Sequence, residues 1–369
     1  MSLHESLPSG CEPTCHGCRH RTWPAERSLA QKHAYLARAL APWSDRLRPV
    51  ESVDAPGRLA YRDRVTLTAR WGEAQGWRFG LMRRDELIAI HDCPVHTPRV
   101  NALVRLLSAR LPRFAQVPLA YLHVAGAQAT LIIKSRSFDP RLLDDVAQGL
   151  SATGLEGLWV HCHPAAGRRM FARSGWTLAW GQPQSRDPTG LVHGPAAFQQ
   201  LLPRLHERAL ESAAQHLAPG PAVSVLDLYC GIGASMRRWR AAGASVLGIE
   251  LAGGAIACAG DNAPCAELLR GTCEQRLPQI RAWWRRQMGT TQVYANPPRS
   301  GLEREVVTAL VQDLRPTQVA YLSCSAGTLA RDLEAFEAGG YDVRSIQPYD
   351  FFPLTHHVET LALLSDRVR

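Results

Sequence analysis

One cysteine stands where a thiol could act as a nucleophile. Residues 318–322 have the pattern of a buried strand and are followed by Ser323-Cys324-Ser325, after which residues 326–337 have the pattern of a helix. A helix N-terminus lowers the pKa of a nearby thiol, and a thiolate is a good nucleophile. Most single cysteines are buried and inert, but this one should share a sheet edge with the polar loop 296–301. We therefore expect Cys324 to be an activated nucleophile.

Two further stretches could supply its partners. The loop Asn296-Pro297-Pro298-Arg299-Ser300-Gly301 follows an apolar strand at residues 293–295, where a flat nucleobase could be held. Near the C-terminus, Phe352 in the run YDFFPLTHHVE could stack on a base. Glu359 begins the last strand, residues 360–364, and could be a general base, with His356 or His357 as alternatives.

A nucleotide-like cofactor site is expected between residues 223 and 262. An apolar run at 223–228 contains Asp227, a turn with Gly231 and Gly233 follows, and a helix at 234–242 leads to a second strand at 245–249 and then Glu250. This order is the first half of a nucleotide-binding α/β sheet. The turn lacks the third glycine of a dinucleotide site and suits S-adenosylmethionine. Glu250 could accept hydrogen bonds from the ribose hydroxyls of this cofactor.

Four cysteines have the spacing of metal ligands. Cys11, Cys15 and Cys18 lie close together, and Cys93 precedes a proline. This set fits a [4Fe-4S] cluster better than zinc, which more often uses paired Cys-x-x-Cys motifs. Neighbouring histidines keep zinc open, and unliganded thiols are a third possibility. The spacing also occurs in radical S-adenosylmethionine enzymes, but those place it after a first barrel strand.

The composition favours a cytoplasmic protein with an acidic partner. The chain has 369 residues with 42 Lys and Arg against 33 Asp and Glu, a net charge of +9, and all but Lys32 and Lys134 of these cations are arginine. Arginine suits phosphate and base recognition, so nucleic acid is a plausible partner, although a GC-rich genome also enriches arginine. No apolar stretch reaches a membrane span of about 18 residues, and a signal peptide is absent. Ten cysteines in a cytoplasmic chain do not indicate a disulfide framework.

The elements that precede the cofactor stretch form an α+β region of mixed order. We expect helices at 25–43, 100–111 and 139–150, and strands at 62–71, 77–81, 86–90, 119–124, 129–134 and 157–161. Arg62 and Arg64 could contact phosphates or simply be solvated. His161-Cys162-His163 is not expected to bind metal, because neighbouring strand residues point to opposite faces. We expect the polar stretch 181–189 to divide a cysteine-rich segment (1–24) and a central α+β domain (25–189) from a domain that holds the cofactor stretch (190–369).

Together these motifs resemble the RNA uracil-5-methyltransferase family. The residues that carry the resemblance are DLYCGIG, NPPRSG, YLSCS and FFPLTHHVE, together with the N-terminal cysteines, YRDR and DCP. The resemblance implies a class I S-adenosylmethionine-dependent methyltransferase fold. Two features are most similar to those of family members that act on bacterial 23S rRNA. Asn296 opens the NPPR motif, and we expect the short N-terminus to lack the TRAM RNA-binding module. We expect a monomer with RNA as partner, 23S rRNA in preference to tRNA.

The resemblance also implies a mechanism. Cys324 would attack C6 of a uracil, C5 would then accept the methyl group, and Glu359 would remove the C5 proton. Tyr229 and Glu250 would lie against the cofactor, Asn296 would contact the uracil or the cofactor, and Arg299 and Phe352 would contact the substrate. The base must leave its stack to enter such a pocket.

Four departures from the family pattern suggest an altered or lost activity. Val192, or His193 after a one-residue shift, stands where we expect the family's glutamine. The third strand ends at Thr272 without the usual acidic or amide group, and Ser325 and Leu354 replace other family residues. The alternative function is therefore a catalytically inactive iron–sulfur protein that binds RNA, and a radical enzyme is a more distant possibility.

Overall fold

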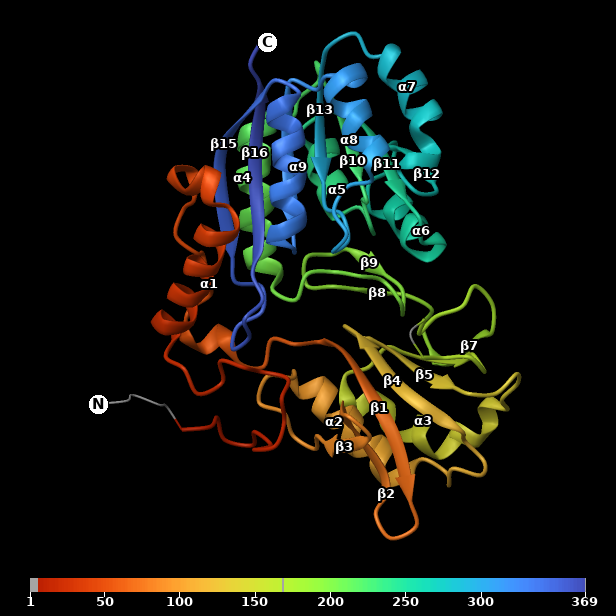
Figure 1. Cartoon of the computed structure of the whole chain (residues 1–369). Helices are drawn as coiled ribbons and strands as arrows, with labels where there is room; N and C mark the ends of the chain where they lie inside the picture. Colours follow the sequence, from red (N-terminus) through yellow and green to blue (C-terminus); the bar gives the residue numbers. More distant parts are fainter. Residues whose placement is uncertain (1–5, 168, 369) are drawn as a thin grey trace. The chain divides into compact units, whose positions relative to one another are not determined.

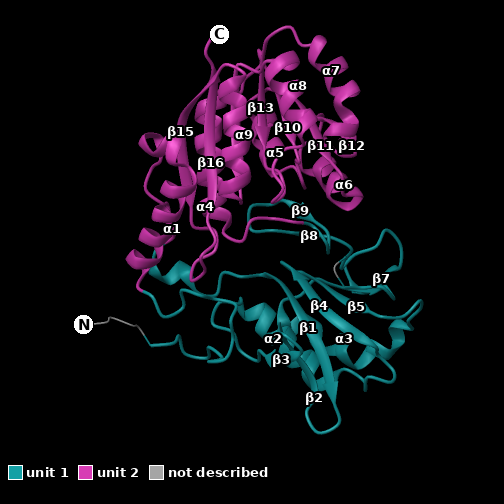
Figure 2. Ribbon diagram, in the orientation of Figure 1, with its two compact units in different colours: residues 1–23, 54–197 teal, residues 24–53, 198–369 magenta. Residues whose placement is uncertain are grey.

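The computed structural model describes residues 6–167 and 169–368. The chain forms two compact units (Figure 2). Unit 1 contains residues 1–23 and 54–197, and unit 2 contains residues 24–53 and 198–369. Each unit has its own sheet and its own hydrophobic core, and each is described separately below.

Unit 2 is built on a seven-stranded sheet in the order β12-β11-β10-β13-β14-β16-β15 (Figure 1). The strands β10 (Val223–Leu228), β11 (Ser245–Glu250), β12 (Glu267–Arg270), β13 (Thr290–Ala295) and β14 (Gln318–Ser323) are parallel. The last strand, β16 (Glu359–Asp366), runs antiparallel between β14 and β15 (Tyr341–Tyr349). The strand order reverses between β10 and β13, and ligands of open α/β sheets bind at such a switch point.

Helices cover both faces of this sheet, as expected for parallel strands that are apolar on both sides. The core on one face takes residues from α1 (Ala25–Ala39), α7 (Leu277–Arg285), α8 (Arg304–Ala309) and α9 (Ala326–Ala338). The other face is covered by three helices that contact successive strands: α4 (Pro203–Leu217), α5 (Ala234–Ala241) and α6 (Gly253–Asn262).

The segment 24–53 belongs to the methyltransferase-like unit, whereas the sequence assigned it to the central region. Leu36, Leu40 and Trp43 are buried in the core of unit 2. Further along, Leu47 and Glu51 form parallel bridges with β15 and extend the sheet at that edge. An amphipathic helix shows in its sequence that it has an apolar face, but not which core that face joins.

Unit 1 is an α+β unit with a seven-stranded sheet in the order β3-β2-β1-β4-β5-β6-β7. All pairs are antiparallel except β5 with β6. Residues from α2 and α3 share one core with alternate residues of the strands, so both helices lie on the same face. The elements are β1 (Arg64–Gly72), β2 (Gly76–Arg83), β3 (Glu86–Ala89), α2 (Pro98–Arg110), β4 (Leu119–Ala125), β5 (Gln128–Ile133), α3 (Asp144–Leu150), β6 (Gly157–Cys162) and β7 (Trp176–Gly181).

A two-stranded ribbon completes unit 1, with β8 (Ser185–Arg186) paired to β9 (Val192–His193). Only β8 lies inside the polar stretch 181–189 that was expected to be the domain boundary, and the boundary between the units falls later, at residues 197 and 198. Among the described residues, no helix is long and apolar enough to cross a membrane.

Candidate active site

The register between β14 and β16 brings Cys324 close to Glu359. Ser323 and Thr360 are antiparallel partners at one end of this strand pair. Cys324 follows Ser323 in the chain and Glu359 precedes Thr360, so the next pair of residues along the ladder is the expected nucleophile and the expected base. The two are close enough that the charge of Glu359 influences the pKa of Cys324.

Glu359 is a buried carboxyl group, 3% exposed. Burial raises its pKa to about 7, although a hydrogen bond from Gln200 and the charge of Arg299 lower it. The Gln200 amide donates from Nε2 to Glu359 Oε2 over 2.6 Å, and Gln200 is itself only 5% exposed. A carboxyl group with a pKa near neutrality can accept and release a proton at physiological pH, which a general base must do.

Gln200 is a site residue that the sequence analysis missed. The expected glutamine position was assigned to Val192 or His193, which form β9 of unit 1. Gln200 lies just before α4, and its amide is directed to the base in spite of a separation of 159 residues. The run Phe198-Gln199-Gln200 before the helix was the signal that could have identified it. An amide side chain is therefore present beside Glu359.

The expectation of a lowered pKa for Cys324 is wrong. The half-buried thiol has a raised pKa, first because of burial and then because of the negative charge of Glu359. Arg299 and a backbone hydrogen bond act in the opposite direction but are weaker. Cys324 is therefore a protonated thiol at neutral pH in the free protein, and it needs a proton acceptor before it can attack.

Side chains of helix α9 hold the loop Asn296–Gly301 in place through hydrogen bonds to its backbone. Thr328 donates to the carbonyl of Arg299 over 3.3 Å, and Arg331 donates to the carbonyls of Ser300 and Leu302. Asp332, buried, accepts from the amide of Leu302 over 3.0 Å. These contacts fix Arg299 on an otherwise exposed loop, next to the charges of Cys324 and Glu359.

Asn296 stands between the two halves of the site. It directly follows β13, is half-buried, and its backbone amide donates to the carbonyl of Leu228 at the end of β10 over 3.3 Å. It therefore lies at the switch point of the sheet, where it can face either a cofactor over β10 or a base near Cys324.

A buried ion pair orders the loop that contains Phe352. Lys32 of α1 pairs with Asp350, and their side chains are 0% and 1% exposed. Lys32 also donates to the carbonyl of Phe352 over 3.3 Å, and the hydroxyl of Ser52 donates to Asp350 over 3.3 Å. The half-buried Phe352 ring makes an edge contact with His357 at 5.9 Å between centroids. His356 and His357 are exposed, unlike Glu359, which favours Glu359 as the base.

The glycine turn after β10 forms the expected cofactor cradle. Gly231 has a left-handed φ of +56°, and a Cβ there would meet nothing within 4 Å. At Gly233, with φ of +82°, an added Cβ would instead lie 3.1 Å from the Cα of Ala259 of α6. Glu250 accepts from the amides of Gly231 (3.1 Å) and Ala252 (2.7 Å), which orients its carboxylate at the tip of β11. The open space at Gly231 beside a fixed carboxylate fits a ribose.

Asp227 and Tyr229 flank this cradle. Asp227 is fully buried and accepts from the indole of Trp239 over 2.8 Å, and burial raises its pKa to about 7. Tyr229 has a left-handed φ of 58° and donates its hydroxyl to Glu303, a residue that the sequence analysis did not select. The amide of Thr272 donates to Gln275 Oε1 over 3.4 Å, and the hydroxyl oxygen of Thr272 accepts from the amide of Gln275 over 3.1 Å, so Thr272 caps the next helical turn.

The four cysteines expected to bind a cluster all lie in unit 1: Cys11, Cys15, Cys18 and Cys93. The pKa of Cys18 is raised to about 11, first by burial, with Arg62 lowering it and the charges of Cys93, Cys15 and Cys11 raising it further. The side chain of Asn101 pairs with both backbone groups of Cys93, and the amide of Gly17 approaches the Cys15 sulfur at 3.4 Å. Within residues 6–167 and 169–368, no group of three or more potential ligands is arranged to hold a metal ion.

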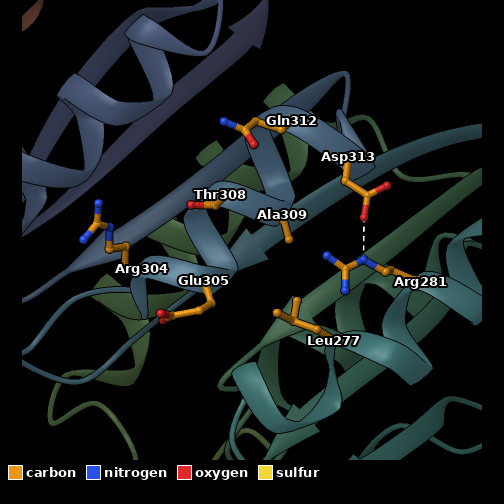
Figure 3. A pocket seen from close by; sticks show the side chains of 8 residues that line it. All are labelled: Leu277, Arg281, Arg304, Glu305, Thr308, Ala309, Gln312 and Asp313. Carbon is orange, nitrogen blue, oxygen red and sulfur yellow. Dashed lines mark hydrogen bonds and ion pairs between the residues drawn. The ribbon is translucent and has the colours of Figure 1, made fainter.

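A surface pocket lies apart from all of these residues, between α7 and α8 (Figure 3). Arg281 and Asp313 form an ion pair across it. None of the expected catalytic or cofactor residues lines it, so we do not assign it to the reaction. The lining residues are Leu277, Arg281, Arg304, Glu305, Thr308, Ala309, Gln312 and Asp313.

Comparisons with known proteins find RNA methyltransferases. A family model described as tRNA (Uracil-5-)-methyltransferase matches residues 274–367, which include Cys324 and Glu359. An uncharacterized RNA methyltransferase of Thermosynechococcus vestitus is 28% identical over 378 residues, covering 95% of this chain and 82% of the relative. An uncharacterized RNA methyltransferase of Streptomyces avermitilis is 37% identical over 181 residues, covering 46% of this chain and 40% of the relative.

The fold is also similar to a solved structure. The tRNA (uracil-54, C5)-methyltransferase of Pyrococcus abyssi, in complex with S-adenosyl-L-homocysteine, superposes with a TM-score of 0.72. The match has 20% identity and covers 95% of this chain and 86% of that chain. Fold and site define an α/β protein of the class I methyltransferase type. The chain is an RNA methyltransferase, and its residues 274–367 match the uracil-C5 family.

Proposed function

We propose that the chain transfers a methyl group from S-adenosylmethionine to C5 of a uridine in RNA, through a covalent bond between Cys324 and uracil C6. The observation that carries the proposal is the pairing of a half-buried thiol with a buried carboxyl group that titrates near pH 7 and is hydrogen-bonded by Gln200. A uracil C5 is a poor nucleophile until C6 has been attacked, so a nucleophile and a base side by side are what the reaction needs.

Cys324 and Glu359 carry out the bond-forming and proton-transfer steps in turn. The Cys324 thiol gives its proton to solvent water, and the thiolate attacks C6, which moves electrons to the C4 carbonyl and makes C5 nucleophilic. S-adenosylmethionine, when bound, supplies an electrophilic methyl group to C5 and leaves as S-adenosylhomocysteine. Glu359 then accepts the C5 proton, and the bond between C6 and the sulfur breaks to release 5-methyluridine and the thiolate.

Arg299 and Gln200 set the charge balance of this pair. The guanidinium of Arg299 lowers the pKa of both Cys324 and Glu359, so it stabilises whichever of them is ionised. Gln200 fixes one carboxylate oxygen, Oε2, and leaves the other to face the substrate. We propose that Asn296 and Phe352 contact the flipped base, Asn296 through its amide and Phe352 by stacking.

S-adenosylmethionine fits the turn after β10. Gly231 leaves room for the ligand, and Glu250 can accept the ribose hydroxyls while its backbone bonds keep it in place. We propose Asp227, Tyr229, Gly233 and Asn296 as the remaining contacts. Tyr229 has a left-handed backbone next to this turn, and its hydroxyl donates to Glu303.

A trapped covalent complex tests the proposal directly. RNA that contains 5-fluorouridine should form a complex with the wild type that survives denaturing gels, because the fluorine cannot leave as the C5 proton does. Glu359→Gln should accumulate a similar complex with ordinary RNA, since addition proceeds and elimination stops. Cys324→Ser should form neither. Absence of any complex with wild type and 5-fluorouridine RNA would contradict the covalent mechanism.

We also propose that Cys11, Cys15, Cys18 and Cys93 hold a [4Fe-4S] cluster with a structural role. Its support is the four-thiol donor set and the interaction of these thiols within one part of unit 1. Cys93→Ala should lose iron and sulfide in anaerobic protein, whereas Cys265→Ala, at an exposed cysteine, should keep both. Equal iron content in the two variants would contradict the assignment.

The identity of the RNA is the last part of the proposal. We propose 23S rRNA as the substrate, with tRNA as the alternative. Methyl transfer to each RNA, purified from cells that lack 5-methyluridine, distinguishes them.

A further inference from the structure

In the described part of unit 1, α2 and α3 both pack on one face of the sheet, and residues of the other face form two chemical zones. Val65, Leu67 and Ala69 of β1 share the core with α2 and α3. Strand residues alternate between faces, so Arg64, Thr66 and Arg70 lie on the opposite face. We call this second surface the open face; it takes its residues from β2, β1, β4, β6 and β7, whereas the side chains of β5 on this face, Gln128, Thr130 and Ile132, are fully buried.

The first zone is a cluster of rings over β4, β6 and β7. Trp176 stacks on His161 at 4.1 Å between centroids and contacts Trp159 edge-on at 6.2 Å. Phe171, in the loop before β7, lies 5.3 Å from Trp176 and 5.1 Å from His123. Of these rings only His161 is fully buried, so the other four present a partly exposed aromatic surface.

Hydrogen bonds hold these rings in fixed positions. The indole of Trp159 donates to Gln128 over 2.9 Å, and that of Trp176 donates to the carbonyl of Ala172 over 2.9 Å. The amide of Ala172 donates to His161 Nε2 over 2.9 Å. Burial, then Arg64, lowers the pKa of His123 to about 4, so its ring is neutral at physiological pH. The cluster is a rigid set of uncharged rings.

The second zone is a pair of like charges on adjacent strands. Arg70 of β1 stands directly opposite Arg78 of β2 in the antiparallel register. Like charges in this position destabilise a sheet unless an anion lies between them. The wider charge balance agrees: unit 1 holds 20 Lys and Arg against 13 Asp and Glu, whereas unit 2 holds 22 against 20.

We propose that the open face binds single-stranded RNA, with Phe171 and Trp176 stacking on unpaired bases and Arg70 and Arg78 holding backbone phosphates. Strands lie about 4.8 Å apart, so the two zones are roughly 20 Å from each other, a span of a few nucleotides. Base stacking on aromatic side chains together with backbone contacts to arginine is how proteins bind single strands without reading a duplex. The inference rests on the proposed RNA substrate and identifies where its flanking nucleotides bind.

The test measures RNA binding by fluorescence anisotropy, without S-adenosylmethionine. The probes are a fluorescein-labelled 15-nucleotide single strand and a duplex of the same sequence. Phe171→Ala and Phe171→Leu should weaken single-strand binding about tenfold, while Phe171→Tyr keeps it. Arg70→Ala should weaken binding to both probes and reduce the salt slope by about one. The controls are Phe114→Ala and Arg113→Ala, at exposed positions on the loop after α2.

The results separate this inference from the proposed reaction. Wild-type affinity in both Phe171→Ala and Arg70→Ala would overturn the inference and leave the face to another kind of partner. An equal loss of single-strand and duplex binding in Phe171→Ala would also overturn it, because stacking needs unpaired bases. Failure of methyl transfer, with the binding differences intact, would overturn the reaction alone.

Discussion

Gln200 donates a hydrogen bond of 2.6 Å to Glu359, and this contact joins the start of α4 to the start of β16. Both side chains are buried, so the amide is the main stabilising contact of a carboxylate that burial otherwise disfavours. The pair explains how Glu359 can have a pKa near neutrality and still ionise.

The pH dependence of methyl transfer should report this carboxyl group. We expect kcat/KM to rise with pH through an inflection near 7, because the base must be ionised. Gln200→Leu removes the hydrogen bond that lowers the pKa, so the inflection should move to higher pH. Gln199→Leu serves as the neighbouring control. If the pH of the inflection in kcat/KM is the same in Gln200→Leu as in wild type, the assignment of this inflection to Glu359 is contradicted.

Glu359 should also make the fold less stable at high pH. Its pKa is raised from 4.5 in the unfolded chain to about 7, so the folded state binds more protons between these values. Stability therefore falls as pH rises through this window, and the loss is complete above pH 7. Relative to wild type, Glu359→Gln should gain about 3 kcal/mol more at pH 8 than at pH 4. Urea unfolding at both pH values measures this, with the exposed Glu305→Gln as control; an equal difference at both would contradict it.

Lys32 and Asp350 should be strongly coupled. Lys32→Met leaves a buried carboxylate without its partner, which costs about 3–5 kcal/mol of unfolding free energy. Lys32→Met with Asp350→Leu should recover most of that loss, and thermal unfolding of the four proteins gives the coupling energy. The exposed pair of Arg46 and Asp45 is the control and should contribute less than about 1 kcal/mol. Additive losses in the double variant would exclude the coupling.

Gly301 should be required for the geometry of the NPPR loop. Its φ is +77°, and a Cβ would lie 2.6 Å from Arg331 Nη2 and 2.7 Å from Asp332 Oδ2. Asp332 cannot move easily, because it also accepts from the Tyr321 hydroxyl over 2.7 Å. Gly301→Ala should therefore reduce methyl transfer at least tenfold. Gly254→Ala, where a Cβ meets nothing within 4 Å, should leave activity unchanged; similar activity in both variants would show that the loop tolerates the change.

Much of the site could be predicted because its signals are local. The strand at 223–228, the glycine turn and Glu250 were predicted from a continuous stretch, and they occupy β10, the turn and the tip of β11. The strand positions of Cys324 and Glu359 followed from apolar runs beside them. Their mutual proximity depends on the β14–β16 register, which the resemblance implied and periodicity alone did not.

Long-range packing explains the parts that could not be predicted. The Gln200 contact spans 159 residues, and no pattern near Gln200 identifies its partner. The raised pKa of Cys324 depends on burial and on Glu359, which outweigh the local effect of the helix N-terminus. The helix at 25–39 has an apolar face, but only the folded chain shows that this face joins the core of unit 2.

The most direct measurement is the transfer of labelled methyl from S-adenosylmethionine to rRNA and tRNA that lack 5-methyluridine, with nucleoside analysis of the product. We predict 5-methyluridine from anaerobically purified wild type and none from Cys324→Ala, whose fold should be unchanged. The absence of label in both RNAs with folded wild type, or full activity in Cys324→Ala, would contradict the account.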